Sequence, residues 1–164
     1  MKSKLFHSKL FEDPYIQELS LVEKLVFIYY VFNSKVNWIG TYEMSDKYVI
    51  FELGIEKELL KAIKQKFQQD KKIFFKDNWV ILYNSEKYDN HMNNIQLMNS
   101  ALIQFESLPK NIQKLFWEIK PVLITTKYRE MFNTCIDKRV KRGDNKKDLI
   151  DKFKAFKKKE ERND

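Results

Sequence analysis

Hydrophobic side chains between positions 20 and 33 recur on nearly every face of a helix, in the segment SLVEKLVFIYYVFN. Ser20 and Glu23 have the spacing of a capping box, in which each side chain caps a backbone N–H group of the other residue. The pattern predicts a helix over 20–33 that is buried on most of its sides. Asn33 begins the break after it.

Two of the three glycines bracket the next predicted elements. Gly40 opens a short β-rich stretch, 40–44, and Gly54 follows a helix predicted over 45–53, at the place where a left-handed residue commonly ends a helix. Residues 57–69 then have hydrophobic side chains at helical spacing: Leu59, Leu60, Ile63 and Phe67. We expect Gly54 to make the turn between two helices.

Two β-rich runs, KIFF and WVILY, follow that helix and are separated by KDN. Asp77 and Asn78 suit a tight turn, so the sequence predicts a β-hairpin over 72–84. Helix, short strand, helix, glycine turn, helix and hairpin is the order of a winged helix-turn-helix, in which the hairpin is the wing. The expected core includes these residues: Phe27, Tyr30, Ile50, Leu60, Ile63, Phe67 and Ile81.

Beyond residue 84 the hydrophobic pattern is helical. Three helices are expected, the second beginning near Pro109 and ending at Pro121. Their apolar faces contain the following residues: Met92, Ile95, Met98, Leu102 and Phe105; Ile112, Leu115, Phe116 and Ile119; Ile124, Tyr128, Met131, Phe132 and Cys135. After a break at Gly143, a last basic amphipathic helix is expected with these apolar residues: Leu149, Ile150, Phe153 and Phe156.

The predicted fold class is therefore mainly α with a small β-hairpin wing. We expect a winged helix-turn-helix domain over 1–88, a helical extension packed on it over 89–137, and a basic helical tail over 138–164. No internal repeat interrupts this order.

Charge changes the picture, because it is concentrated at one end of the chain. The 164 residues carry a net charge of +8, of which +6 lies in 138–164 and only +2 in the rest. A basic tail is a common means of holding a polyanion, and equally of keeping a protein soluble. The single cysteine and the lack of a long apolar run or a secretion signal predict a cytoplasmic protein without a membrane partner.

Candidate DNA contacts lie on the predicted helix 57–69, at the hairpin tip and in the tail. Lysines at i, i+4 and i+7 are suited to phosphates, and glutamine pairs with adenine edges in the major groove. The candidates are Lys57, Lys61, Lys64, Gln65 and Gln68 on the helix, Lys76 and Asn78 at the tip, and Lys138, Arg139, Lys141 and Arg142 in the tail. The alternatives are a solvated helix face chosen for helix propensity, a plain hairpin turn and a frayed basic end.

The sequence offers little for catalysis or for a cofactor. His7 and His91 are the only histidines, Cys135 has no motif around it, and no phosphate-binding glycine loop or metal-ligand spacing occurs. We expect no enzymatic activity, no catalytic residue, no metal and no cofactor. Trp38 and Trp79 are interpreted as packing residues.

Several short motifs in the first two-thirds of the chain occur together in a known order: Asp13-Pro14-Tyr15-Ile16, Leu19-Ser20, Glu23-Lys24, Phe27, Asn33, Gly40-Thr41-Tyr42-Glu43, Gly54-Ile55, Lys72-Ile73, Trp79-Val80-Ile81 and Asn84. In residues 11 to 109 the chain resembles the N-terminal domain of replication-initiation, or replisome-organiser, proteins of phages and plasmids of Gram-positive bacteria, with distant likeness to DnaD-like primosome proteins. The resemblance implies a winged helix that acts at replication origins by binding DNA or other replisome proteins.

Two hypotheses follow. The first is a DNA-binding protein of phage or mobile-element origin that binds double-stranded DNA in replication initiation or its control. The second is a protein-interaction module on a winged-helix scaffold, which forms homo-oligomers, organises a replisome or inhibits a host nucleoprotein machine. A continuous positive surface over helix 56–69 and the wing would favour the first, and an apolar or acidic patch the second.

Overall fold

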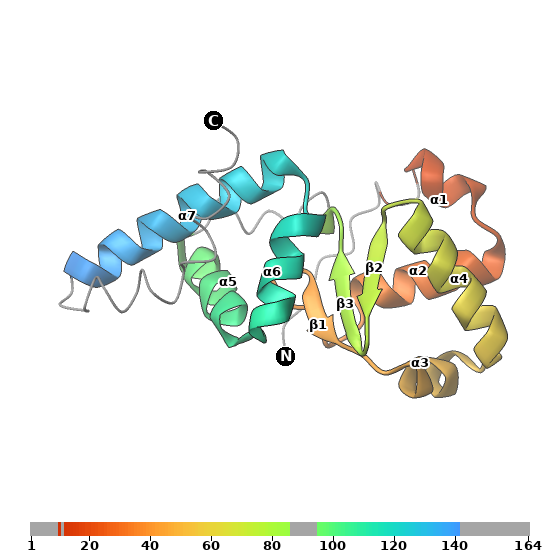
Figure 1. The fold of residues 1–164 in the computed structure, drawn as a ribbon. Helices are drawn as coiled ribbons and strands as arrows, with labels where there is room; N and C mark the ends of the chain where they lie inside the picture. The colour runs from red at the N-terminus through yellow and green to blue at the C-terminus, as the bar shows by residue number, and fades with distance from the viewer. Residues whose placement is uncertain (1–9, 11, 86–94, 142–164) are drawn as a thin grey trace. The chain divides into compact units, whose positions relative to one another are not determined.

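The computed structural model describes residues 10, 12–85 and 95–141 (Figure 1). The described part is mainly helical, with seven helices and a three-stranded antiparallel sheet. The chain divides into two units, residues 1–88 and 89–164. The first unit contains α1 (Pro14–Glu18), α2 (Leu21–Phe32), β1 (Thr41–Glu43), α3 (Asp46–Leu53), α4 (Lys57–Gln69), β2 (Ile73–Lys76) and β3 (Trp79–Leu82).

Local capping sets the helix boundaries of the first unit. The Asp13 carboxylate accepts from the Tyr15 N–H at the start of α1 (3.1 Å), where Pro14 occupies a first-turn position that needs no N–H donor. At α2 the Ser20 N–H donates to Glu23 (2.7 Å) and the Glu23 N–H donates to the Ser20 hydroxyl (3.3 Å), which confirms the predicted capping box. Gly54 ends α3 with a left-handed φ of 61°, as predicted.

The sheet has the order β1-β3-β2, so β3 lies between its two neighbours. The predicted hairpin is confirmed: Lys76 pairs with Trp79 across a two-residue turn in which Asp77 has a φ of 54°. Aspartate tolerates this left-handed conformation better than most residues. The Met44 N–H donates to the Asn78 carbonyl (2.7 Å), which attaches the end of β1 to the hairpin turn.

The core of the first unit lies between α2, α4 and the sheet. The Phe27 and Phe67 rings meet edge to face at 5.4 Å, and the Tyr30 ring lies 5.1 Å from that of Phe75. Six of the seven predicted core residues are buried, and Ile50 is the exception. Val49, one position earlier on α3, is fully buried in its place.

The prediction that α2 is buried on most sides holds only in part, because Ile28, Tyr29 and Phe32 are partly buried against the core but one side is exposed. Its buried residues are Val26, Phe27, Tyr30 and Val31, which form one face. On the opposite face Leu21 is 83% exposed and Leu25 is 48% exposed. The apolar pattern is continuous around the helix, but the core of this unit leaves the side with Leu21 and Leu25 exposed.

A buried polar network attaches β1 to the end of α2. The Tyr42 hydroxyl donates to the Tyr30 carbonyl (2.5 Å) and accepts from the Asn33 side-chain amide (3.0 Å). The same amide donates to the Tyr29 carbonyl (3.0 Å) and to the Tyr30 carbonyl (3.3 Å), the second of which has no backbone partner within the helix end. Burial raises the pKa of Tyr42, so its hydroxyl remains a donor throughout the neutral range.

The second unit contains α5 (Ile95–Ser107), α6 (Lys110–Ile119) and α7 (Val122–Lys141). Pro109 caps α6, and the helical interpretation of the β-branched stretch after Pro121 is confirmed. Its core is a cluster of rings, Phe105, Phe116, Trp117, Tyr128 and Phe132, and Cys135 lies fully buried on α7. The predicted break at Gly143 and the last helix lie outside the described residues.

Candidate nucleic-acid interface

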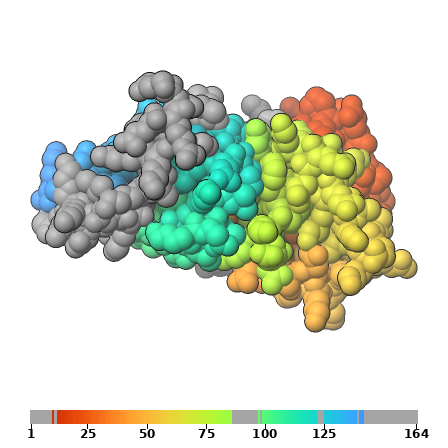
Figure 2. Space-filling view, in the orientation of Figure 1, coloured from red at the N-terminus to blue at the C-terminus, as the bar shows by residue number. Residues whose placement is uncertain are grey.

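The candidate interface is built on α3, the turn at 54–56, α4 and the β2–β3 hairpin. The Gly54 N–H donates to the Ile50 carbonyl (2.9 Å), which closes the end of α3. A side chain at position 54 would meet nothing within 4 Å, so glycine is required there for its φ and not for space. Figure 2 shows the surfaces of α4 and of the hairpin side by side on one face of this unit.

Helix α4 buries one face and exposes most of its predicted contact residues. Leu60, Ile63 and Phe67 are buried in the core. The following predicted residues are exposed: Lys57, Lys61, Gln65 and Gln68. At about 100° per residue, Lys57, Lys61 and Gln68 share one side of the helix, and Gln65 points directly away from the core.

Leu59 departs from the predicted apolar face. Its side chain is 43% exposed, whereas the other three members of that face are buried. Leu59 lies at the edge of the apolar stripe, about 40° beyond Ile63 on the side away from Leu60. The stripe on α4 is therefore narrower than its sequence pattern indicates.

Lys64 has a position different from that of the other α4 lysines. Its Nζ lies 2.5 Å from Asp46 Oδ1 at the start of α3 and 4.6 Å from the centroid of the Phe75 ring on β2. Only 14% of its side chain is exposed. Its ammonium is therefore already paired within the unit. The side chains of Lys57 and Lys61, in contrast, are exposed.

A lysine that the sequence did not single out also connects two helices. Lys66 Nζ donates to Glu23 Oε1 (2.7 Å), which joins α4 to the first turn of α2. The hydrogen bond from Lys66, supported by those from Ser20, holds the pKa of the Glu23 carboxyl below its usual value. No spacing rule links positions 23 and 66, so the sequence carried no signal of this pair.

The hairpin tip exposes Lys76, Asp77 and Asn78. The loop is only two residues long, so its reach from the sheet is short. The Asp77 carboxylate adjoins Lys76 in sequence and reduces the positive potential at the tip. The backbone carbonyl of Asn78 accepts a hydrogen bond from the Met44 N–H, but the Asn78 side chain remains exposed.

The predicted tail contacts begin on a regular helix in the second unit. Lys138 and Lys141 are exposed residues at the end of α7, and Arg139 belongs to the same helix. Arg142 lies outside the described residues. The boundary predicted between 137 and 138 falls inside α7, which continues without a break to Lys141.

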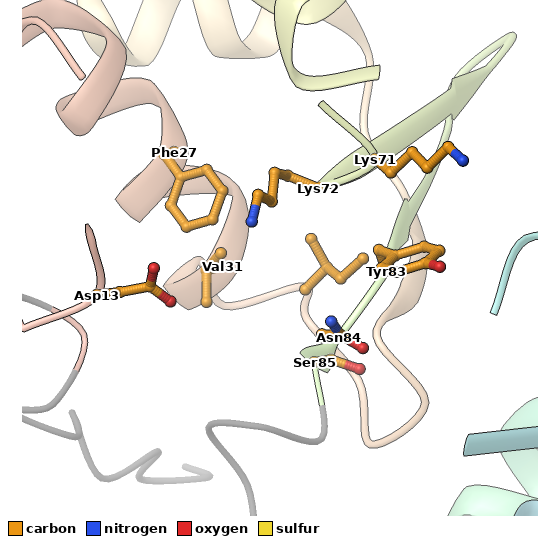
Figure 3. A pocket seen from close by; sticks show the side chains of 9 residues that line it. Asp13, Phe27, Val31, Lys71, Lys72, Tyr83, Asn84 and Ser85 are labelled. Carbon is orange, nitrogen blue, oxygen red and sulfur yellow. The ribbon is translucent and has the colours of Figure 1, made fainter. Parts of the chain in front are cut away.

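A separate hollow in the first unit is shown in Figure 3. Its volume is about 50 Å³, and it is lined by Asp13, Phe27, Val31, Lys71, Lys72, Leu82, Tyr83, Asn84 and Ser85. Lys72 points into it with its ammonium 4.3 Å from the centre of the Tyr15 ring, while Lys71 points away. A space of this size holds a few water molecules and is too small for a nucleotide.

Two further observations concern only the described part of the chain. No group of three His, Cys, Asp or Glu side chains in residues 10, 12–85 and 95–141 is placed to hold a metal ion. None of the helices formed by these residues has the length and apolar character needed to cross a bilayer. Comparisons with protein families, with characterised proteins and with solved structures return no match to this chain.

Proposed function

We propose that the first unit is a winged helix-turn-helix domain that binds double-stranded DNA, in replication initiation or its control in a phage or mobile element. The observation that carries the proposal is the row of exposed residues Lys57, Lys61 and Gln68 on α4, the helix whose surface adjoins that of the hairpin (Figure 2). In helix-turn-helix proteins the second helix lies in the major groove. Here that helix is α4.

The residue types favour backbone contact over detailed sequence reading. Lys57 and Lys61 neutralise phosphates, and Gln65 and Gln68 suit adenine edges. The first unit contains no arginine, the residue that pairs with guanine in two-point contacts. Residues 1–137 have a net charge of only +2, so the +6 of residues 138–164 is proposed to add affinity that is independent of sequence.

A salt titration of binding to random and origin-like duplexes tests this proposal. Replacing Lys57 and Lys61 by alanine should lower the slope of log affinity against log salt by roughly 0.9 for each phosphate that is no longer neutralised. The matched control replaces Lys114 and Lys127, exposed helical lysines of the second unit, and removes the same charge. An equal fall in slope for both double variants would contradict a specific role for α4.

The tail contribution is separated by replacing Lys138 and Lys141 with alanine in the same assay. The expected result is a weaker affinity for all duplexes alike, because lysine contacts to phosphates carry no sequence information. If neither pair of substitutions changes binding, or if the protein binds no duplex at all, the proposal of a DNA-binding function is wrong.

A second candidate function, protein interaction, is favoured by the outer face of α2. Leu21 and Leu25, one helical turn apart, are exposed there, while Ile28 and Phe32 further along α2 are partly buried against the core. Phe51 on α3 is also 83% exposed. Large apolar side chains that remain exposed in this way favour a contact with another protein surface.

The second candidate is tested by the molar mass of the full chain in solution. If α2 mediates self-association, light scattering over a concentration series should show a mass that falls when Leu21 and Leu25 become lysine. The control is Ile103→Lys on α5, which is 61% exposed before substitution. An unchanged mass in both variants would remove α2 as a contact between copies.

A further inference from the structure

Lys64 is the point at which three elements of the first unit meet. From α4 its ammonium contacts the Asp46 carboxylate on α3, and it lies over the ring of Phe75 on β2. The Phe75 ring in turn packs on Tyr30 of α2. One side chain therefore connects the helix proposed to enter the groove with the helix before it and with the strand that leads to the hairpin tip.

The surroundings of this contact strengthen it. The Lys64 side chain is 14% exposed and that of Asp46 is 48% exposed, so the charges are partly removed from water and attract one another more strongly than at an open surface. The ring face of Phe75 adds a cation–π contact to the ion pair. Because Asp46 stays about half exposed, replacing Lys64 leaves a hydrated carboxylate, so the expected loss is that of the ion pair and the cation–π contact themselves.

We infer that Lys64 is a positioning residue, which fixes α4 against α3 and β2, and that it does not contact phosphate. The part of this inference that concerns DNA rests on the proposed function. Lys57 and Lys61 lie seven and three positions before Lys64 on the same helix, so their direction in space depends on how α4 is seated. The hairpin tip lies at the end of the strand that Lys64 contacts.

The first experiment is a thermal unfolding cycle of the full chain with Lys64→Met, Asp46→Asn and the double variant. Methionine keeps most of the apolar stem and removes the charge. Lys64→Met should lower Tm by about 2–4 °C, the shift that corresponds to the removal of one interaction in a chain of this size. The double variant should be destabilised by less than the sum of the two single variants, because the pair is already broken.

The matched control is Lys61→Met, the same chemical change at an exposed position one turn earlier. Its Tm should be unchanged. Additive effects in the cycle, or an equal fall in Tm for Lys61→Met, would overturn the inference without any reference to DNA.

The second experiment measures DNA binding well below Tm, where the variants are fully folded. Lys64→Met should weaken binding by at least about fivefold, comparable to removing one well-placed hydrogen-bonded pairing with a base, while the salt slope stays at the wild-type value. Lys61→Met should lower the slope by roughly 0.9. Lys64→Arg keeps the charge toward Asp46 and should recover most of the affinity.

The two proposals fail in different ways. If Lys64→Met lowers the salt slope as Lys61→Met does and leaves Tm unchanged, Lys64 is a phosphate contact and the inference is wrong. If Lys64→Met leaves both affinity and slope unchanged, it has no positioning role in binding. If the wild-type chain binds no duplex, the proposed function fails, and the unfolding cycle alone decides whether Lys64 fixes α4.

Discussion

In the first unit, polar side chains join elements that lie far apart in the sequence in addition to its ring contacts, whereas the described core of the second unit is dominated by packed rings. Tyr15 donates to Asp70 (2.8 Å) across 55 positions, and Lys66 donates to Glu23 across 43. In the second unit Phe116 lies 5.4 Å from the centroids of both Phe105 and Tyr128.

This difference affects how the relative orientation of the elements is fixed in each unit. Hydrogen bonds and ion pairs are directional, so they fix the angle at which one element meets another. Ring packing contributes a large buried area together with a preference for edge-to-face or offset arrangements. The two polar contacts attach α4 and its C-terminal end to α2 and α1 of the first unit. We interpret them as fixing how these helices meet.

The largest expected effect is the removal of a ring from the second unit. Phe116→Ala removes a fully buried side chain that packs against Phe105, Trp117 and Tyr128, and it should cost about 3–5 kcal/mol of stability. The measurement is the urea midpoint, together with amide exchange in α5, α6 and α7. Ile103→Ala, at an exposed position of α5, should change stability by less than about 0.5 kcal/mol. Equal costs would mean that the ring cluster does not hold this unit.

A smaller effect, in the first unit, is expected at Gly40. Gly40 and Gly54 share a φ of 61°, but a Cβ at Gly40 would lie 2.6 Å from the Ser85 Cβ, while one at Gly54 meets nothing. Gly54→Ala should cost about 1 kcal/mol through backbone strain alone. Gly40→Ala should cost about 2–3 kcal/mol, because strain and a clash combine.

Thermal or chemical unfolding of these two variants separates strain from steric contact. Adding Ser85→Gly to Gly40→Ala should recover the part due to the clash and leave the strain. An equal loss of stability in Gly40→Ala and Gly54→Ala would show that Ser85 moves away from the new Cβ without any effect on stability.

A third prediction concerns the buried network at Tyr42. Tyr42→Phe removes the bond to the Tyr30 carbonyl and leaves the Asn33 amide with one acceptor fewer. The expected cost is about 1–2 kcal/mol, measured from the urea midpoint. Tyr83→Phe removes a hydroxyl from a partly exposed ring and serves as the control. A cost no greater than that of the control would contradict the view that directional bonds hold β1 on α2.

The smallest effect is a pH dependence at Glu23. Its pKa in the folded state lies below the unfolded value of about 4.3, so the stabilisation it provides is present above that pH and is lost as pH falls through the folded-state pKa. Lys66 is 42% exposed, which limits the contribution to about 0.5–1 kcal/mol.

Glu23→Gln should therefore be less stable than wild type at neutral pH, and the difference should shrink in acid. The measurement is the urea midpoint at a series of pH values from neutral to below about 4. A difference that stays constant over this range would mean that the charge of Glu23 does not contribute.

Local patterns predicted much of this fold, because caps, turns and apolar spacing act within a few residues. The capping box at Ser20, the left-handed Gly54 and the Asp77 turn were all predicted and are confirmed. The errors at α2, Ile50 and Leu59 have a common origin. An apolar pattern gives the faces that are suited to burial, but the neighbours that cover them are decided by distant parts of the chain.

The candidate site was less predictable than the fold. Its lysines are placed on α4 as the periodicity indicates, but Asp46 lies 18 positions from Lys64, and only the packing of α3 on α4 brings them together. Several residues of the family resemblance also have roles within the unit: Asp13 caps α1, Tyr15 bonds to Asp70, and Asn33 holds Tyr42. Each of these three residues therefore has a role in the fold of the unit.

The buried thiol of Cys135 is a built-in probe for the opening of the second unit. It is the only cysteine in the chain and lies fully buried on α7, so a thiol reagent reaches it only when that helix opens. At low reagent concentration the labelling rate gives the equilibrium fraction of open molecules, and at high concentration it gives the opening rate itself. The kinetics of one alkylation reaction, followed by mass spectrometry, therefore measure how often the aromatic core opens to solvent in the native chain. Neither an added probe nor a substitution is needed.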